Sequence, residues 1–297
     1  MIKKIANKNM HWILLLPYIL LFTTFIVIPV AMAVGLSFTQ FDGIMMPVWN
    51  GARNYINLLA QDDIFMRHVL PNTLQFALVV GPGGYILAFM LAWLISQLSN
   101  IPRTILAIVI YSPSLTAGTT MTVVWQVLFS GDRAGYINNL LISLGVTTNP
   151  IQFLLSSAWI MPVMMIVALW SSMGVGFLAM LAGILNTDQE VYEAAYIDGV
   201  RNRAQEIYYV TIPMMKPQML FGAVMAIVNT FAAAGIGVQL TGANPTPGYA
   251  GQLIVNHIED FGINRYEMGY AAAISVVLLL IIWGFYSLTN KLFREKD

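Results

Sequence analysis

The run Trp12–Leu36 reads WILLLPYILLFTTFIVIPVAMAVGL and contains no acidic or basic residue. A helix needs about 20 mostly apolar residues to cross the hydrocarbon core of a bilayer. Six stretches of this chain meet that requirement, and we predict membrane spans at Trp12–Leu36, Thr73–Ile95, Thr104–Leu128, Ala158–Leu185, Gln218–Leu240 and Tyr266–Thr289. Each must be helical, because backbone N–H and C=O groups in lipid need partners within their own segment.

The composition agrees with an all-α integral membrane protein. Only 9% of the 297 residues are charged and 58% are hydrophobic, whereas about 25% of the residues of a soluble domain are charged. The 14 basic residues balance the 14 acidic residues, so net charge gives no reason to expect a nucleic-acid partner. The absence of cysteine excludes structural disulfides and cysteine-based metal sites.

Lysine and arginine alone indicate the orientation, because they accumulate in cytoplasmic loops. One side of the predicted topology, which includes both chain ends, carries Lys3, Lys4, Lys8, Arg103, Arg201, Arg203, Lys216, Lys291, Arg294 and Lys296. The opposite side carries only Arg53, Arg67, Arg133 and Arg265. We therefore predict six spans with both termini in the cytoplasm.

The first apolar run has a second interpretation as a cleavable signal peptide. Its basic start and the small residues of Ala31-Met32-Ala33 favour cleavage. Against it, the run is longer than the about 7–15 residues of a signal-peptide core, and Pro29 lies beside the supposed cleavage site. We expect the first helix to be retained.

The loop at about 186–217, between the fourth and fifth predicted spans, is the most informative part of the chain. Thr187 and Glu190 have the spacing of a capping box, which predicts that a helix begins there. Gly199 is placed to end that helix.

A second short helix is predicted to begin after Asn202, with Gln205 three residues further on, and to end before Pro213. Residue chemistry alone describes this loop equally well as a polar connector on the membrane surface.

A family resemblance separates these two interpretations. The loop contains Glu193-Ala194-Ala195, Asp198-Gly199, Thr211-Ile212-Pro213 and Lys216-Pro217. This pattern resembles the EAA loop of binding-protein-dependent ABC importer permeases, and is most similar to the carbohydrate permeases of the maltose-transporter type. Weaker similarities, such as Trp170–Gly174 and Gly269–Ser275, extend the resemblance over essentially the whole chain. One departure is visible, because the interval between Gly199 and Pro213 is one residue longer than the common pattern.

The resemblance implies that this chain is one subunit of a transporter with several subunits. Residues 1–297 would form a single transmembrane domain with the type I ABC importer permease fold, in the bacterial cytoplasmic membrane. A second homologous permease would complete a heterodimer, and an extracytoplasmic solute-binding protein would deliver substrate. Two ATPase subunits would bind ATP and Mg²⁺, so no cofactor is expected in this chain. The ATPase-coupling residues on the cytoplasmic EAA helix would be Glu193, Ala194, Ala195, Asp198 and Gly199.

The residues argue against other functional classes. None of the 23 glycines precedes a lysine, so the chain has no P-loop and we expect no enzyme activity. The predicted spans carry no Asp, Glu, Lys or Arg away from their ends, which leaves a proton-coupled carrier without a proton path. The isolated acidic pairs Asp62-Asp63 and Glu259-Asp260 are typical of solvated loops rather than a metal site.

The substrate path is predicted from polar and aromatic residues at mid-membrane depth. The main candidates are Trp125, Gln126, Trp170, Ser171, Asn229 and Thr230, and Gln75 and Tyr111 are secondary candidates. Asn229 is the best single choice, because an amide in the membrane interior needs polar partners. A hydrogen bond to a neighbouring helix explains Asn229 equally well, and packing or interface anchoring explains the tryptophans better than sugar stacking.

The sequence thus predicts a permease subunit that forms the translocation path for a sugar or oligosaccharide. The alternatives are an ion-coupled secondary carrier and a permease for a non-sugar solute. A sodium site built from backbone carbonyls would serve such a carrier.

Overall fold

The computed structural model describes residue 12 and residues 14–115, 118–233 and 235–293. The described chain is mostly helical, and its strands form one short antiparallel ribbon, β1 (Thr39–Gln40) with β2 (Val48–Trp49). The chain divides into two compact units, residues 1–62 with 257–279 and residues 63–256 with 280–297. Each unit is described by itself.

The first unit begins with the apolar helix Leu14–Leu36, whose second half is the π-helical turn η1 (Thr23–Val27) followed by α2 (Ile28–Leu36). The ribbon and α3 (Arg53–Ala60) follow it. The buried amide of Asn54 donates hydrogen bonds to the carbonyl oxygens of Ser37 and Thr39, each at 2.9 Å. These bonds fix the loop after the first span as a small folded lid.

The rest of the first unit surrounds Asp62. The π-helical turn η5 (Asp260–Asn264) leads to α16 (Met268–Phe293), whose first part belongs to this unit. The Asp62 carboxylate lies 2.8 Å from Nε2 of His257 and accepts a hydrogen bond of 2.9 Å from the hydroxyl of Tyr270. This polar cluster ties the end of the lid to the start of the last span.

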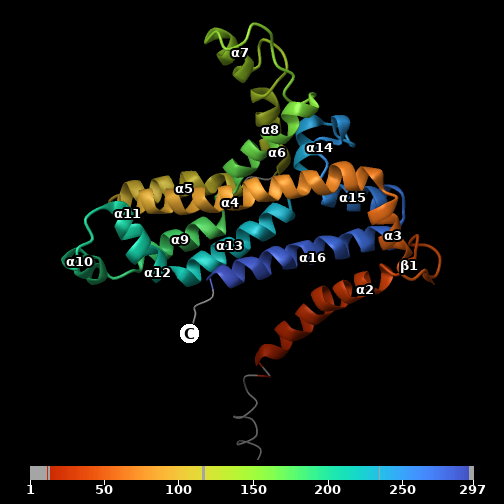
Figure 1. Cartoon of the computed structure of the whole chain (residues 1–297), viewed down its shortest axis with the longest axis horizontal. Coiled ribbons are helices and arrows are strands. Elements are labelled where there is room, and N and C mark those ends of the chain that lie inside the picture. Colours follow the sequence, from red (N-terminus) through yellow and green to blue (C-terminus); the bar gives the residue numbers. More distant parts are fainter. Residues whose placement is uncertain (1–11, 13, 116–117, 234, 294–297) are drawn as a thin grey trace, which may run out of the picture. The chain divides into compact units, whose positions relative to one another are not determined.

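The second unit contains most of the helices, including those that build the candidate site. They are η2 (Phe65–Val69), α4 (Leu70–Ser96), α5 (Asn100–Leu115), α6 (Gly118–Leu128), α7 (Tyr136–Ser143), α8 (Ser157–Ser171), α9 (Val175–Leu185), α10 (Gln189–Ile197), α11 (Arg203–Glu206), η3 (Ile207–Thr211), α12 (Ile212–Met214), α13 (Lys216–Phe231), α14 (Ile236–Thr241) and η4 (Pro247–Tyr249). The helix α15 (Ile254–Glu259) crosses the boundary between the units. Within the second unit, α4, α9 and α13 pack against one another (Figure 1).

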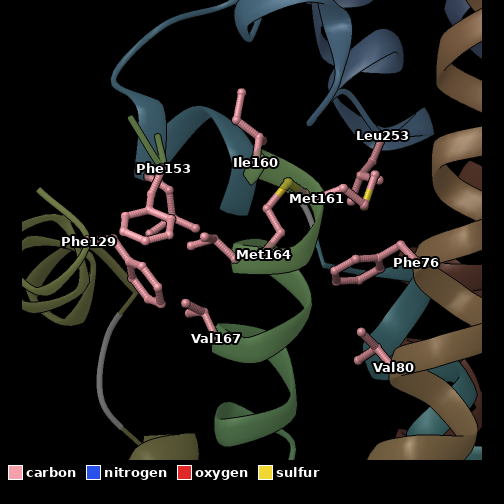
Figure 2. Close-up of a cluster of buried hydrophobic side chains, with 11 residues drawn as sticks. Phe76, Val80, Phe129, Phe153, Ile160, Met161, Met164, Val167 and Leu253 are labelled. Carbon is pink, nitrogen blue, oxygen red and sulfur yellow. The ribbon is translucent and has the colours of Figure 1, made fainter. Parts of the chain in front are cut away.

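Two apolar clusters form the core of the second unit. The first joins α4 to α8 and to the segments around Phe129, Phe153 and Leu253 (Figure 2). The second joins α4 to α9 and to Met215 and Met219 near the start of α13. Burial in lipid supplies no hydrophobic force between helices, so these contacts act through close packing.

The structure has helices at the predicted spans, but some of these helices are interrupted. By length and apolar composition, three described helices are able to cross a membrane unbroken: Leu14–Leu36, Phe65–Ser96 and Met268–Lys291. Two further helix pairs pass the same test only as bent units, Ser157–Ser171 with Val175–Leu185 at 43° and Arg203–Met214 with Lys216–Phe231 at 85°. The number of six spans therefore stays a prediction.

The expectation of continuous helices is wrong at two points. The fourth predicted span breaks between α8 and α9, where Gly174 has non-helical backbone angles. The fifth predicted span ends at Phe231, and α14 begins only after Gly235, whose φ is +75°. Glycine adopts such conformations without the steric cost of a side chain. In the third predicted span, residues 116 and 117 between α5 and α6 lie outside the described part of the chain.

Candidate functional site

A cavity of about 290 Å³ lies within the second unit, between α4, α8, α9 and α13. It is found where the spans are interrupted. Ser172 and Gly174 line it from the break after α8, and Ala233 lines it from the break after α13. Irregular backbone at membrane depth is tolerated where it is buried in protein or lines a cavity, and broken helices commonly mark solute sites in transporters. The cavity is therefore the first candidate for a solute site.

Small side chains let the walls of this cavity come close together. A Cβ atom at Gly84 of α4 would lie 2.8 Å from Oγ of Ser172. One at Gly176 of α9 would lie 3.3 Å from the Cα atom of Gly222 of α13. A larger residue at either position would require the neighbouring atoms to move, the Ser172 side chain at Gly84 and the backbone of α13 at Gly176.

The polar groups in the cavity are neutral. None of the described residues that line it is Asp, Glu, Lys, Arg or His. The hydroxyls of Ser171, Ser172 and Thr230 donate to carbonyl oxygens of their own helices, those of Val167, Leu169 and Ala226. Their oxygens keep lone pairs that can still accept a hydrogen bond.

Asn229 differs from these hydroxyls. It lines the cavity with an exposed side chain, and its amide makes no hydrogen bond with the described residues of this chain. An unpaired amide in a membrane span requires water, a solute or another chain as its partner. The alternative bond from Asn229 to a neighbouring helix is thus not present within the described chain.

The structure brings together three of the six main sequence candidates for the substrate path. Ser171, Asn229 and Thr230 line one cavity. Trp125 and Trp170 do not line it. Their rings pack edge to face with centroids 5.3 Å apart, and Trp125 packs against the first apolar cluster. Their placement matches the packing interpretation of the tryptophans.

Gln126 also lies away from the cavity. Its side-chain nitrogen donates a hydrogen bond of 2.7 Å to the carbonyl oxygen of Gln239. The bond joins α6 to α14, so Gln126 supports the helix after the break. Of the secondary candidates, Tyr111 packs against the second apolar cluster and Gln75 is exposed, and neither lines the cavity.

Several residues of the cavity lining are not predicted from the sequence. They are mainly Tyr85, Ser114, Ser172, Met180 and Met225. Ser172 and the neighbouring Gly174 give a usable signal, because both lie at the break between α8 and α9. Nothing in the sequence distinguishes the two methionines from packing residues.

The loop at 186–217 forms two short helical arms. The first arm, α10, has no buried residue. It ends as predicted at Gly199, whose φ is +103°. The N–H groups of Gly199 and Val200 donate to the carbonyl oxygens of Tyr196 and Ala195, which is the hydrogen-bond pattern of a Schellman motif.

The start of α10 differs from the prediction by one residue. Asp188, not Thr187, is the N-cap residue, and no side chain caps the helix. The Thr187 hydroxyl instead donates to the carbonyl oxygen of Gly183 at 3.1 Å, near the end of α9. The predicted capping box with Glu190 is therefore wrong, because the preceding helix already engages the threonine.

The second arm begins as predicted and ends later than predicted. The side-chain oxygen of Asn202 accepts a hydrogen bond of 2.8 Å from the N–H of Gln205. The helical path then passes through the π-helical turn η3 and continues beyond Pro213 to Met214. A π-helical turn contains about one residue more than an α-helical turn, and η3 lies in the interval between Gly199 and Pro213.

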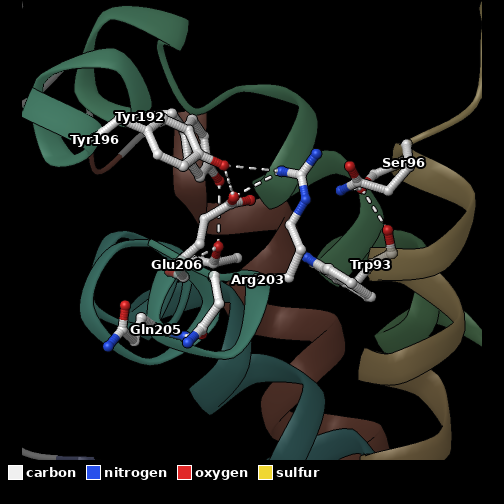
Figure 3. Close-up of polar contacts among 10 residues, drawn as sticks. Trp93, Ser96, Tyr192, Tyr196, Arg203, Gln205 and Glu206 are labelled. Carbon is white, nitrogen blue, oxygen red and sulfur yellow. Dashed lines mark hydrogen bonds and ion pairs between the residues drawn. The ribbon is translucent and has the colours of Figure 1, made fainter. Parts of the chain in front are cut away.

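A buried carboxylate connects the two arms (Figure 3). Glu206 is 4% exposed and accepts hydrogen bonds from the hydroxyl of Tyr196 and, at 2.6 Å, from Nη1 of Arg203. Nη1 of Arg203 also donates to the Tyr196 hydroxyl oxygen at 3.2 Å. The hydrogen bond to Glu206 raises the pKa of Tyr196 above its usual value, and the same carboxylate raises the pKa of Arg203.

The predicted coupling residues lie on the outer side of this loop. Glu193, Ala194, Asp198 and Gly199 are exposed, and Ala195 is half-buried. Glu193 also lines a second cavity, of about 480 Å³, that separates part of α10 from the ends of α4 and α9. The surface of α10 is thus accessible to another molecule.

Comparisons with known proteins agree over nearly the whole chain. The permease of an arabinooligosaccharide transport system from Halalkalibacterium halodurans is 28% identical over 94% of this chain and 85% of its own length. The permease of a lactose transport system from Rhizobium radiobacter is 27% identical over 91% of this chain and 89% of its own length.

A solved structure shows the same fold. One chain of a bacterial ABC transporter that imports the acidic polysaccharide alginate superposes with a TM-score of 0.79 at 22% identity, over 99% of this chain and 98% of that chain. The fold is therefore that of an ABC importer permease.

The family model described as "binding-protein-dependent transport system inner membrane component" matches residues 81–292. That interval includes the cavity between α4, α8, α9 and α13, both arms of the 186–217 loop and most of α16. The chain belongs to this family of inner membrane transport components, and it is a multi-pass permease rather than an enzyme.

Proposed function

We propose that this chain is the permease subunit of an ATP-driven importer and forms the membrane path for a neutral sugar or oligosaccharide. The neutral cavity with the unpaired amide of Asn229 carries this proposal. Sugar hydroxyls donate and accept hydrogen bonds and carry no charge, so they suit an amide beside hydroxyl oxygens. The arabinooligosaccharide and lactose permeases among the relatives support a carbohydrate substrate.

The lack of charge in the cavity favours neutral sugars over uronates. A carboxylate moved into a cavity of low dielectric loses its hydration, at a cost of several kcal/mol unless a cation pairs with it. No described residue of the lining is such a cation. This chain therefore differs in its expected substrate from the importer of acidic alginate that shares its fold.

The energy is proposed to come from two separate ATPase subunits that bind ATP and Mg²⁺. A second homologous permease completes the membrane path, and a solute-binding protein outside the cytoplasm delivers the sugar. The family description supports the binding protein, and the Lys and Arg distribution supports a cytoplasmic position for both termini and for the 186–217 loop.

The loop is proposed to dock into the ATPase through α10. Its exposed face contains Glu193 and Ala194, with Ala195 half-buried beside them. Small side chains let a partner approach the helix backbone, while a carboxylate can pair with a basic residue on that partner. Asp198 and Gly199 end the helix, so α10 is short enough to move as one rigid body.

Uptake by the reconstituted complex tests the proposal. Liposomes containing this chain, the second permease and the ATPase subunits receive the loaded binding protein outside and ATP inside. We expect ATP-dependent accumulation of a neutral oligosaccharide and little accumulation of an oligouronate of the same length. Preferential uptake of the oligouronate would contradict the neutral cavity as the selective element.

The same liposomes separate the proposal from an ion-coupled carrier. A carrier would accumulate solute on a sodium or proton gradient without ATP, ATPase subunits or binding protein. The ATP-driven importer requires all three and is indifferent to the gradient.

A further inference from the structure

The helix α10 is held to the rest of its loop by polar contacts rather than by a buried apolar face. It has no buried residue. Tyr192 and Tyr196 are four residues apart and so lie on one face of the helix. Both hydroxyls reach the second arm, Tyr192 at 3.4 Å from Oγ1 of Thr211 and Tyr196 at the Glu206 carboxylate.

Glu206 is an unusual residue at the centre of this contact. Its carboxylate is buried, whereas most other polar side chains of this loop are exposed to solvent. Arg203 is 60% exposed, so the ion pair is only partly buried; it adds little stability, but with Tyr196 it joins α10 to α11 by hydrogen bonds. The three-residue group Tyr196–Glu206–Arg203, here named the arm clamp, therefore fixes the angle between α10 and α11 (Figure 3).

The backbone between the arms does not fix that angle by itself. The connection passes through Gly199 at φ +103°, and glycine turns rotate with little steric resistance. The cavity of about 480 Å³ lies between α10 and the residues Trp93, Ser96 and Arg103 of its opposite wall, so these residues do not pack against α10. The clamp is thus the charged part of the connection between the arms, beside the 3.4 Å contact of Tyr192 with Thr211.

The second arm leads directly to the membrane path. From Glu206 the chain continues through η3 and α12 into α13, which carries Asn229. Along this part of the chain, a displacement of α10 reaches α13 through the second arm, so the two arms must move together. Without the clamp, the same displacement is absorbed by rotation at Gly199.

We propose that Tyr196, Glu206 and Arg203 are positioning residues that transmit the movement of α10 to α13, so that ATP hydrolysis remains coupled to opening of the cavity. This inference rests on the proposed function, because it assumes that an ATPase moves α10. The clamp touches neither the sugar nor ATP. Its loss therefore lowers the yield of transport per ATP rather than hydrolysis itself.

Tyr196→Phe is the direct test, because it removes one hydroxyl from a half-exposed ring and leaves its carbon framework. The complete complex is reconstituted in liposomes with binding protein, sugar and ATP, and sugar transported per ATP hydrolysed is measured. A hydrogen bond to a charged group is worth about a tenfold change in an equilibrium, so we expect this ratio to fall about tenfold while ATP hydrolysis persists. Tyr208→Phe is the matched control, since Tyr208 is an exposed tyrosine of the same loop outside the clamp; it should leave the ratio unchanged.

A second variant keeps the test valid if Tyr196→Phe does not assemble. Arg203 is 60% exposed, so Arg203→Gln is compatible with folding. It should also lower the amount of sugar transported per ATP hydrolysed. Arg203→Lys should largely restore that ratio. The test requires a wild-type complex that transports sugar. If Tyr196→Phe or Arg203→Gln assembles and transports as much sugar per ATP hydrolysed as the wild type, the proposed role of the clamp is wrong. Absence of ATP-driven uptake in the wild-type complex overturns the proposed function instead, so the two failures are distinguishable.

Discussion

Asn229 presents an unpaired amide to the cavity between α4, α8, α9 and α13. Asn229→Leu preserves approximate size and removes both hydrogen-bonding groups. We expect the rate of sugar uptake by the reconstituted complex to fall about tenfold, as for the loss of one or two hydrogen bonds to the solute. Asn229→Gln should retain part of the rate. Val228→Leu is the control, because Val228 is the exposed neighbouring residue and does not line the cavity. Equal rates of sugar uptake for Val228→Leu and Asn229→Leu would mean that Asn229 does not contact the solute.

Gly199 occupies a backbone conformation that side chains rarely adopt, with φ at +103°. Gly199→Ala should therefore destabilise the turn between the arms by about 1–2 kcal/mol. The expected result is weaker association of the ATPase subunits, measured as the fraction that co-purifies with the permease. Gly35→Ala is the control, because Gly35 lies in α2 with open space around its Cβ position. It should leave association unchanged.

The element α14 depends on a close approach of two backbones. A Cβ atom at Gly237 would collide with the carbonyl oxygen of Gly251. Because neither atom is the end of a flexible side chain, Gly237→Ala should lower the free energy of unfolding by about 1–3 kcal/mol. Thermal unfolding of the purified permease in detergent measures this. Gly284→Ala, in α16 with nothing near its Cβ position, should melt like the wild type; a similar melting temperature for both variants would contradict the predicted collision.

The elements also show what a sequence can and cannot predict. Long apolar runs identify spans such as Phe65–Ser96, because lipid leaves a helix as the only local solution. The breaks at Gly174 and Gly235 were missed, since a small residue suits both tight helix packing and an interruption. Asn229 stands out in the sequence as an amide at membrane depth, and it lines the cavity, but the packing of Trp125 depends on contacts that no local pattern contains.

The loop at 186–217 gives the same lesson at a finer level. Its helix end at Gly199 and its cap at Asn202 follow from local hydrogen bonds and were predicted. The threonine at 187 and the aspartate at 188 both suit a cap, and only the extent of α9 decides between them. Glu206 was not singled out, because its partner Tyr196 lies on the other arm.

At the scale of the whole molecule, the topology is directly testable. Reporter fusions after Asn57 and Asn290 should report opposite sides of the membrane, with Asn290 in the cytoplasm. The reason is the greater number of Lys and Arg residues in the loops on the side of both termini. Finding the two positions on the same side would contradict the predicted arrangement of six spans.

The energy source is testable on the isolated chain. The permease purified without its partners should neither bind nor hydrolyse ATP, because its sequence has no P-loop lysine. Adding the ATPase subunits should restore hydrolysis. Robust hydrolysis by the permease alone, free of co-purified ATPase, would contradict the division of labour between subunits.

ATP-driven uptake by the Ala195→Trp complex tests the central claim most directly. Ala195 lies half-buried on α10, and an indole there would overfill the proposed contact with the ATPase while the helix stays outside the bilayer. Ala204→Trp, at an exposed alanine of α11, is the matched control. The account predicts that Ala195→Trp inserts normally but loses both sugar uptake and sugar-stimulated ATP hydrolysis, whereas Ala204→Trp retains them. Normal uptake and a normal ATPase complex with Ala195→Trp would mean that α10 is only a connector, and would contradict the coupling role of this loop.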